Sequence, residues 1–255
     1  MAAVLAAELL KLRTARSTSV VLALVAVIAA LGVLMAASGA NAFDAAGAAE
    51  RSRWAAVAPI EQEYLAFWQV CLAVLGALAV TAEYGSGMIR TTLAAVPRRG
   101  AVLAAKAGAV GALALAAGAV AVVGTHVAVR AVLGDRPFDA YTAPMAETVP
   151  LLAALSAAAA VAALVGLGAG VLLRSTAGAI VAAVALIFAP PMIARFLAEP
   201  WADRVAAGSL TGLPAQIAGT APDPVLGPVA AGAVLAAYAV AALAAGAVAL
   251  HRRDV

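Results

Sequence analysis

Long apolar segments with almost no charge constrain this chain more than any other feature. A helix needs about 20 predominantly apolar residues to cross the hydrocarbon core of a bilayer. Six segments meet this requirement, at about residues 20–37, 64–82, 101–129, 148–173, 177–194 and 225–250. They lack the two-residue alternation of a membrane β-barrel and are rich in Ala. The sequence therefore predicts an all-α, polytopic membrane protein with six transmembrane helices, forming a single domain over residues 1–255.

The composition excludes the other broad classes of protein. Hydrophobic residues make up 65% of the 255 residues and charged residues only 11%, whereas about a quarter of the residues in a soluble domain are charged. Such a chain cannot cover a water-facing surface, and a disordered chain needs the opposite composition. The one cysteine, Cys71, excludes a disulfide within the chain and a multi-cysteine metal site.

The chain also lacks the motifs of an enzyme. It has no Gly-x-x-x-x-Gly-Lys-Ser/Thr phosphate loop, so we do not expect it to bind ATP in the Walker manner. Its two histidines, His126 and His251, cannot form a multi-histidine metal site. His126 lies four residues before Arg130, and we interpret them as a partly hydrated pair at the membrane interface, with a substrate contact as the alternative. We expect no catalytic residue, no metal and no cofactor bound by this chain.

The distribution of basic residues predicts the orientation in the membrane. With the N-terminus in the cytoplasm, ten of the 16 Lys and Arg residues lie inside and six outside, as the positive-inside rule requires. The inner set is Lys11, Arg13, Arg16, Arg90, Arg98, Arg99, Lys106, Arg174, Arg252 and Arg253. Trp54, Trp68 and Trp201 fall in or beside the outer loops, where an interfacial aromatic belt is expected. We expect a cell-membrane protein with both termini in the cytoplasm, and we attribute the basic balance to topology and not to nucleic-acid binding.

The N-terminal segment has two interpretations. Leu5, Leu9 and Leu12 are spaced by four and three residues, with charged residues around them, which predicts an amphipathic helix on the inner membrane surface. A simple basic anchor for topology explains the charges equally well. A signal peptide is disfavoured, because its apolar region is typically 7–15 residues long and residues 20–37 exceed that length.

The loop between the second and third segments contains a predicted short helix. Gly85 and Gly87 let the backbone turn as it leaves the membrane. Residues 88–95 are long enough for a two-turn helix, and Pro97 ends it. Such a helix suits docking of a cytoplasmic partner, although an ordinary connecting loop is also compatible with the sequence.

Small residues predict close helix packing. Gly166, Gly168 and Gly170 fall in the fourth segment, and Gly108 and Gly111 in the third. Such residues let backbones approach closely, although Gly and Ala are abundant enough here for the spacing to arise by chance.

Two motifs together resemble a known family. Glu-x-x-Lys-Leu-Arg precedes the first segment, and Glu-Tyr-x-x-Gly-Met-Ile-Arg-x-Thr-Leu follows the second. This combination is similar to the permease subunit of an ATP-binding-cassette (ABC) exporter of the second (ABC-2) membrane type. The later Pro-Arg-Arg-x₆-Lys and the Arg-Arg-Asp tail fit the same pattern.

The resemblance implies roles for particular residues. It implies a coupling helix that contacts an ATPase subunit through Glu83, Tyr84, Gly87, Met88, Ile89, Arg90 and Thr91. It also implies an N-terminal interfacial helix on the inner leaflet, carrying Glu8, Lys11 and Arg13. The outer loop between the fifth and sixth segments, over residues 210–222, would dip into the membrane.

From these features we expect a permease subunit of an ATP-driven exporter. It would act with a second permease subunit, identical or related, in the lipid bilayer, and with separate ATPase subunits that bind ATP and Mg. The predicted pathway is lined by apolar residues, which suits lipids, apolar drugs or peptides and identifies no substrate-binding residue. The alternatives are a non-transporting assembly or sensor subunit and, less favoured, an intramembrane enzyme.

Overall fold

A computed structural model describes residues 2–55 and 57–252, and the regular secondary structure of this part of the chain is entirely α-helical. Six of its helices are long and apolar enough to cross a membrane, which confirms the predicted number. They are α2 (Arg16–Ala45), α5 (Leu65–Ser86), α7 (Arg99–Leu133), α9 (Met145–Leu173), α10 (Thr176–Ala194) and α13 (Pro228–Arg252). Arg253 and Asp254 of the basic tail lie outside the described residues.

The long helices extend beyond the apolar segments that predicted them. The helix α2 begins at Arg16 and α7 begins at Arg99, because basic residues continue a helix as readily as apolar ones do. The last helix starts later than predicted, at Pro228, a residue whose fixed φ suits the first helical turn.

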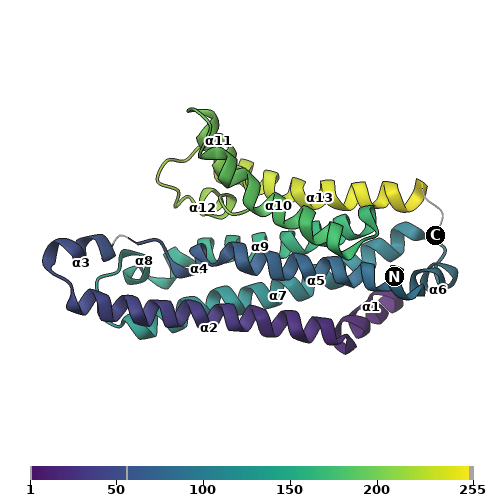
Figure 1. The fold of residues 1–255 in the computed structure, drawn as a ribbon, viewed down its shortest axis with the longest axis horizontal. Coiled ribbons are helices and arrows are strands. Elements are labelled where there is room, and N and C mark those ends of the chain that lie inside the picture. The colour runs from purple at the N-terminus through teal and green to yellow at the C-terminus, as the bar shows by residue number, and fades with distance from the viewer. Residues whose placement is uncertain (1, 56, 253–255) are drawn as a thin grey trace.

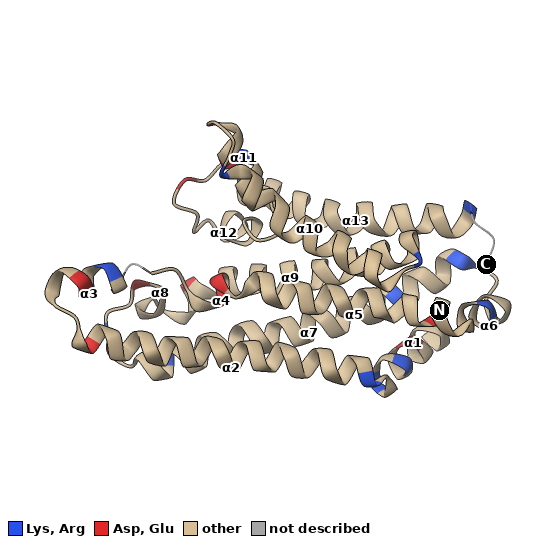
Figure 2. Ribbon diagram, viewed as in Figure 1, with Lys and Arg blue, Asp and Glu red and all other residues tan. Residues whose placement is uncertain are grey.

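Short helices gather at the two ends of the bundle. The helices α1 (Ala2–Thr14) and α6 (Met88–Ala95) lie at the end where the two termini are, and α3 (Ala48–Ala55), α4 (Ile60–Glu63) and α8 (Asp139–Thr142) lie toward the opposite end (Figure 1). Charged residues also gather toward the two ends and leave the middle of the bundle nearly free of them (Figure 2). This distribution is the one that a membrane-spanning bundle requires.

The helix α9 forms the centre of the bundle and packs against α5, α7 and α13. At three glycines, its backbone lies directly against that of α5 or α13. A Cβ atom added at Gly76 of α5 would overlap the carbonyl oxygen of Ala163, and one at Gly166 would overlap that of Ala73. A Cβ atom at Gly168 would likewise overlap a carbonyl oxygen of α13. The glycines of the fourth segment therefore permit close helix approach, as the sequence predicts.

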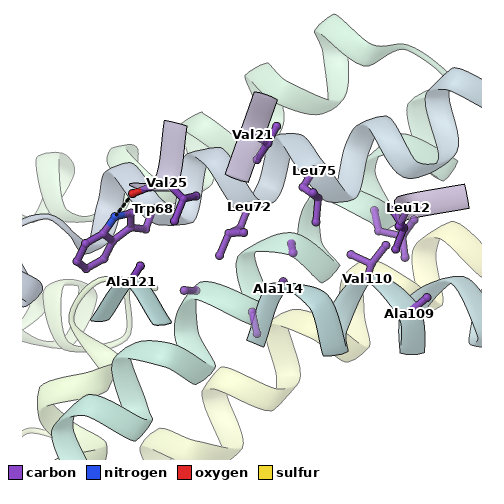
Figure 3. Close-up of a cluster of buried hydrophobic side chains, with 14 of the residues drawn as sticks. Leu12, Val21, Val25, Trp68, Leu72, Leu75, Ala109, Val110, Ala114 and Ala121 are labelled. Atoms are coloured by element: carbon purple, nitrogen blue, oxygen red, sulfur yellow. Dashed lines mark hydrogen bonds between the residues drawn. The ribbon is translucent and has the colours of Figure 1, made fainter. Parts of the chain in front are cut away.

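The main apolar core joins α2, α5, α7 and α9 and includes Trp68 (Figure 3). Trp68 is fully buried, and its indole Nε1–H donates a hydrogen bond to the carbonyl oxygen of Val25 at 3.3 Å. The assignment of Trp68 to an interfacial aromatic belt is therefore wrong. A buried indole is accommodated here because the α2 carbonyl accepts its N–H.

The loop between α10 and α13 contains α11 (Trp201–Ala207), which packs against α10, and α12 (Leu213–Ala218), which folds back against α9 and α13. Leu210 and Leu213 are fully buried, and the side-chain amide of Gln69 in α5 donates to the Leu210 carbonyl oxygen at 2.9 Å. Irregular backbone at membrane depth has to be covered by protein in this way. The depth of this loop in a bilayer stays a prediction.

Candidate functional site

Four charged side chains from three helices meet at the end of the bundle that carries α1 and α6. Lys106 of α7 contacts Glu8 of α1 and Glu83 of α5, with Nζ to Oε distances of 2.6 Å and 2.8 Å. Lys11 of α1 contacts the same two carboxylates at 2.7 Å and 2.8 Å. We call Glu8, Lys11, Glu83 and Lys106 the charge cluster. It ties the N-terminal helix to the second and third membrane helices.

The charge cluster is buried and internally compensated. The side chains of Glu8, Glu83 and Lys106 are 3–4% exposed, and that of Lys11 is 33% exposed. The ammonium group of Lys106 also donates to the Ala79 carbonyl oxygen at 3.1 Å, so it has three acceptors for its three N–H groups. Charges can be buried in this way because each has partners of opposite sign.

Lys11 is held in its charged form. Burial alone would lower the pKa of Lys11, but the hydrogen bonds to Glu8 and Glu83 and the charges of both carboxylates raise it above its ordinary value. The Lys11 ammonium group therefore stays positively charged near neutral pH.

The N-terminal helix makes a contact with the bundle that the sequence did not predict. The expected apolar stripe is only partly buried, since Leu12 is 7% exposed but Leu5 and Leu9 are each 37% exposed. Glu8 turns inward to Lys106, while Arg13 is exposed. An ion-paired contact with the bundle thus holds α1, and its position on a membrane surface stays a prediction.

The candidate coupling segment, Glu83–Thr91, begins within the charge cluster. The helix α5 ends at Ser86, and Gly87 adopts a φ of 73° at the junction with α6. This left-handed conformation favours glycine. Gly85 lies inside α5, so the expected turn at Gly85 is wrong and Gly87 alone makes it. The helix α6 covers the range predicted for it, Met88–Ala95.

The other residues of the coupling segment divide into an anchored and an exposed group. Ile89 is 4% exposed and lines the same small cavity as Leu103 of α7 and Leu250 of α13. Met88, Arg90 and Thr91 are exposed. The segment therefore has one apolar anchor in the bundle and presents a basic side chain at the surface.

Two basic residues that the sequence did not assign to the site lie beside these groups. Lys106 completes the charge cluster, and Arg174 places its guanidinium carbon 5.3 Å from the ring centroid of Tyr84, within range of a cation–π contact. For Lys106 a signal was present, because a lone charge seven residues into a long apolar helix needs a partner. Arg174 directly follows α9 and has a φ of 51°. No sequence pattern indicates this left-handed backbone conformation at an arginine.

A second buried polar group lies toward the opposite end of the bundle. Glu61 accepts a hydrogen bond from the Tyr141 hydroxyl at 2.8 Å, and its other oxygen lies 2.6 Å from His126 Nδ1. Arg130 instead donates to the carbonyl oxygen of Ala143. The interpretation of His126 and Arg130 as a partly hydrated pair is therefore wrong, because His126 is fully buried against a carboxylate from α4. Across residues 2–55 and 57–252, no group of three or more His, Cys, Asp and Glu side chains could hold a metal ion.

Comparison with known proteins gives one family. A family model described as "ABC-2 family transporter protein" matches residues 4–190. That range includes the charge cluster, the coupling segment, the first four long helices and α10 as far as residue 190. No curated protein matches the chain.

Proposed function

This chain belongs to the ABC-2 family of transporter membrane proteins, and on that premise we propose that it is the permease subunit of an ATP-driven exporter. It is a multi-pass membrane protein with six candidate spans. We propose that both termini and α6 face the cytoplasm, and that transport is directed outward. Separate ATPase subunits would bind ATP and Mg, and a second permease subunit would complete the pathway.

The observation that supports this proposal most is the connection between the coupling segment and the charge cluster. Glu83 is both the first residue of the segment and a member of the cluster, so a force applied to α6 reaches α5 through the Gly87 turn. From Glu83 it reaches α7 through Lys106 and α1 through Lys11. Buried ion pairs transmit displacement because separating them leaves uncompensated charges.

Arg90 is the side chain best placed to contact an ATPase subunit. It is exposed on α6, next to the buried anchor Ile89, and a guanidinium group forms charge-assisted hydrogen bonds with surface carboxylates. Closure of two ATPase subunits on ATP would then move α6, and with it the helices joined at the charge cluster.

The non-transporting alternative makes a different prediction. An assembly or sensor subunit would keep the same six helices but would not bind an ATPase. The intramembrane enzyme is less favoured, because the buried carboxylates Glu8, Glu61 and Glu83 are each held by contacts with other helices and the family match describes a transporter.

The test is co-purification with the ATPase subunit, followed by ATP hydrolysis in the reconstituted complex. We expect Arg90→Glu to weaken ATPase association and to abolish its coupling, while the variant still inserts and folds. Arg16→Glu is the matched control, because Arg16 is exposed at the same end of the bundle and contributes equally to the positive-inside balance. Normal coupling in Arg90→Glu with the ATPase bound would remove α6 from the mechanism, and purification without any ATPase would favour the non-transporting alternative.

A further inference from the structure

A cavity of about 330 Å³ lies beside the charge cluster, a volume within the range of small-molecule sites. Its walls come from α1, the start of α2, α5 and α7, together with Met88 of α6. Leu75, Leu78 and Val110 supply apolar surface. Exposed residues such as Ala82 also line the cavity, so it reaches the protein surface.

One polar atom of a residue that lines this cavity is buried without a partner. Glu83 is 3% exposed, and its Oε1 accepts hydrogen bonds from both Lys11 and Lys106. Its other oxygen, Oε2, has no hydrogen-bond partner among the residues that the structure describes. A buried carboxylate oxygen without a donor is costly. Since Glu83 lines the cavity, a bound molecule can supply the missing donor.

The charges around the cavity select the kind of donor. The charged residues that line it are the four members of the charge cluster, and two carboxylates and two ammonium groups give a formal net charge of zero. A positively charged ligand would be repelled by the two lysines, and no unpaired negative charge would compensate for it. A negatively charged ligand would be repelled by the unpaired oxygen of Glu83. An uncharged hydroxyl can donate to Oε2 without either penalty.

We propose that this cavity binds an uncharged amphiphile, with its apolar body against Leu75, Leu78 and Val110 and a hydroxyl group donating to Glu83 Oε2. The site requires only this chain, so it stands apart from the proposed coupling to an ATPase. Both a resident bilayer lipid and a transported molecule can present this chemistry.

The experiment is photolabelling of the purified full chain in nanodiscs. The probes are decanol, decylamine and decanoate, each carrying the same diazirine on its alkyl chain, with labelled residues located by mass spectrometry. We expect the alcohol to label the cavity lining roughly tenfold more than the carboxylate, which lacks a donor for Glu83 Oε2, and this is the factor for one hydrogen bond of about 1.4 kcal/mol. We also expect the alcohol to label more than the amine, whose positive charge would lie near Lys11 and Lys106.

Two matched variants separate binding in the cavity from partition into the bilayer. Ala82→Trp fills the cavity from its exposed rim and should remove the preferential labelling. Ala104→Trp places the same side chain at an exposed position of α7 outside the cavity and should leave the labelling unchanged. Glu83→Gln should reduce the preference for the alcohol, with size-exclusion chromatography and circular dichroism checking that the variant is folded.

Equal labelling by the three probes, or labelling unaffected by Ala82→Trp, would overturn the proposal and leave a cavity filled by water or by non-specific alkyl chains. In the complex with its ATPase, loss of the alcohol label on addition of ATP would support a transported ligand, and a label retained through ATP addition would support a resident lipid. Both of these results support the site. Only the loss of label on addition of ATP depends on the proposed function, so failure of ATPase coupling and failure of ligand binding are distinguishable.

Discussion

Replacing Lys106 by Met tests the central contact of the molecule. The methionine side chain keeps a similar length and apolar stem but removes the ammonium group that contacts Glu8, Glu83 and the Ala79 carbonyl. The charge cluster then contains two carboxylates and only Lys11, so one buried negative charge is uncompensated.

The expected cost follows from burial. Removing one partner of a buried ion pair costs about 3–5 kcal/mol, and both carboxylates here are 3–4% exposed. Lys11→Met is the matched control, because this lysine contacts the same carboxylates from a position that is 33% exposed. For Lys11→Met we expect a smaller loss than for Lys106→Met, because water can reach this partly exposed position and solvate the carboxylate charge that the substitution leaves.

The assay is reversible unfolding in mixed micelles of increasing denaturing-detergent fraction, followed by circular dichroism. A double change of Lys106→Met with Glu8→Gln restores charge balance, and we expect it to recover about 0.5–3 kcal/mol relative to the sum of the single changes. A loss below about 1 kcal/mol for Lys106→Met, or equal losses for the two lysines, would refute the view that the buried ammonium group holds the three helices together.

Three further predictions test the topology, the packing and the opposite end of the bundle. A membrane-impermeant maleimide added to intact cells should label Ser52→Cys but not Ser86→Cys, and labelling of the second would reverse the proposed orientation. Gly76→Val should destabilise the fold by about 3 kcal/mol or more, because its side chain would overlap α9 backbone, whereas Gly124→Val meets no atom within 4 Å and should unfold like the unaltered protein. Burial and the charge of the neighbouring carboxylate raise the pKa of Tyr141 above its ordinary value of 10.0, so its contribution to stability is complete below pH 10.0 and is lost as the pH rises above it. Unfolding measured against pH should therefore show an alkaline loss that Tyr141→Phe makes shallower, and an unchanged slope would contradict this.

The helices were predictable because hydrophobic length is a local property of the chain. Crossing a bilayer requires long apolar segments whatever their neighbours are, so their number could be read from the sequence. The range Met88–Ala95 was predictable for a similar reason, since Gly87 and Pro97 bound it. The proposed coupling role of this helix depends on the family resemblance and on an ATPase partner.

Contacts between distant segments were not predictable in the same way. Glu8 and Lys106 are 98 positions apart, and Glu61 and His126 are 65 apart. Each is a polar residue in or beside an apolar helix, which indicates that a partner exists but does not say which one. Trp68 was misplaced for the same reason, because proximity to a loop does not reveal that a carbonyl of α2 accepts its N–H.

The glycine contacts of α9 restrict how this subunit can change shape. Where Gly76, Gly166 and Gly168 bring backbones together, no side chain lies between the helices to change rotamer and let them slide. The helices α5, α9 and α13 should then travel as one block during a transport cycle. The relative motion that opens a pathway has to occur at the margins of this block, at α2 and α10. Only 22% of the most apolar stretch of each of these helices is buried inside the subunit, which leaves surface for lipid or a second subunit.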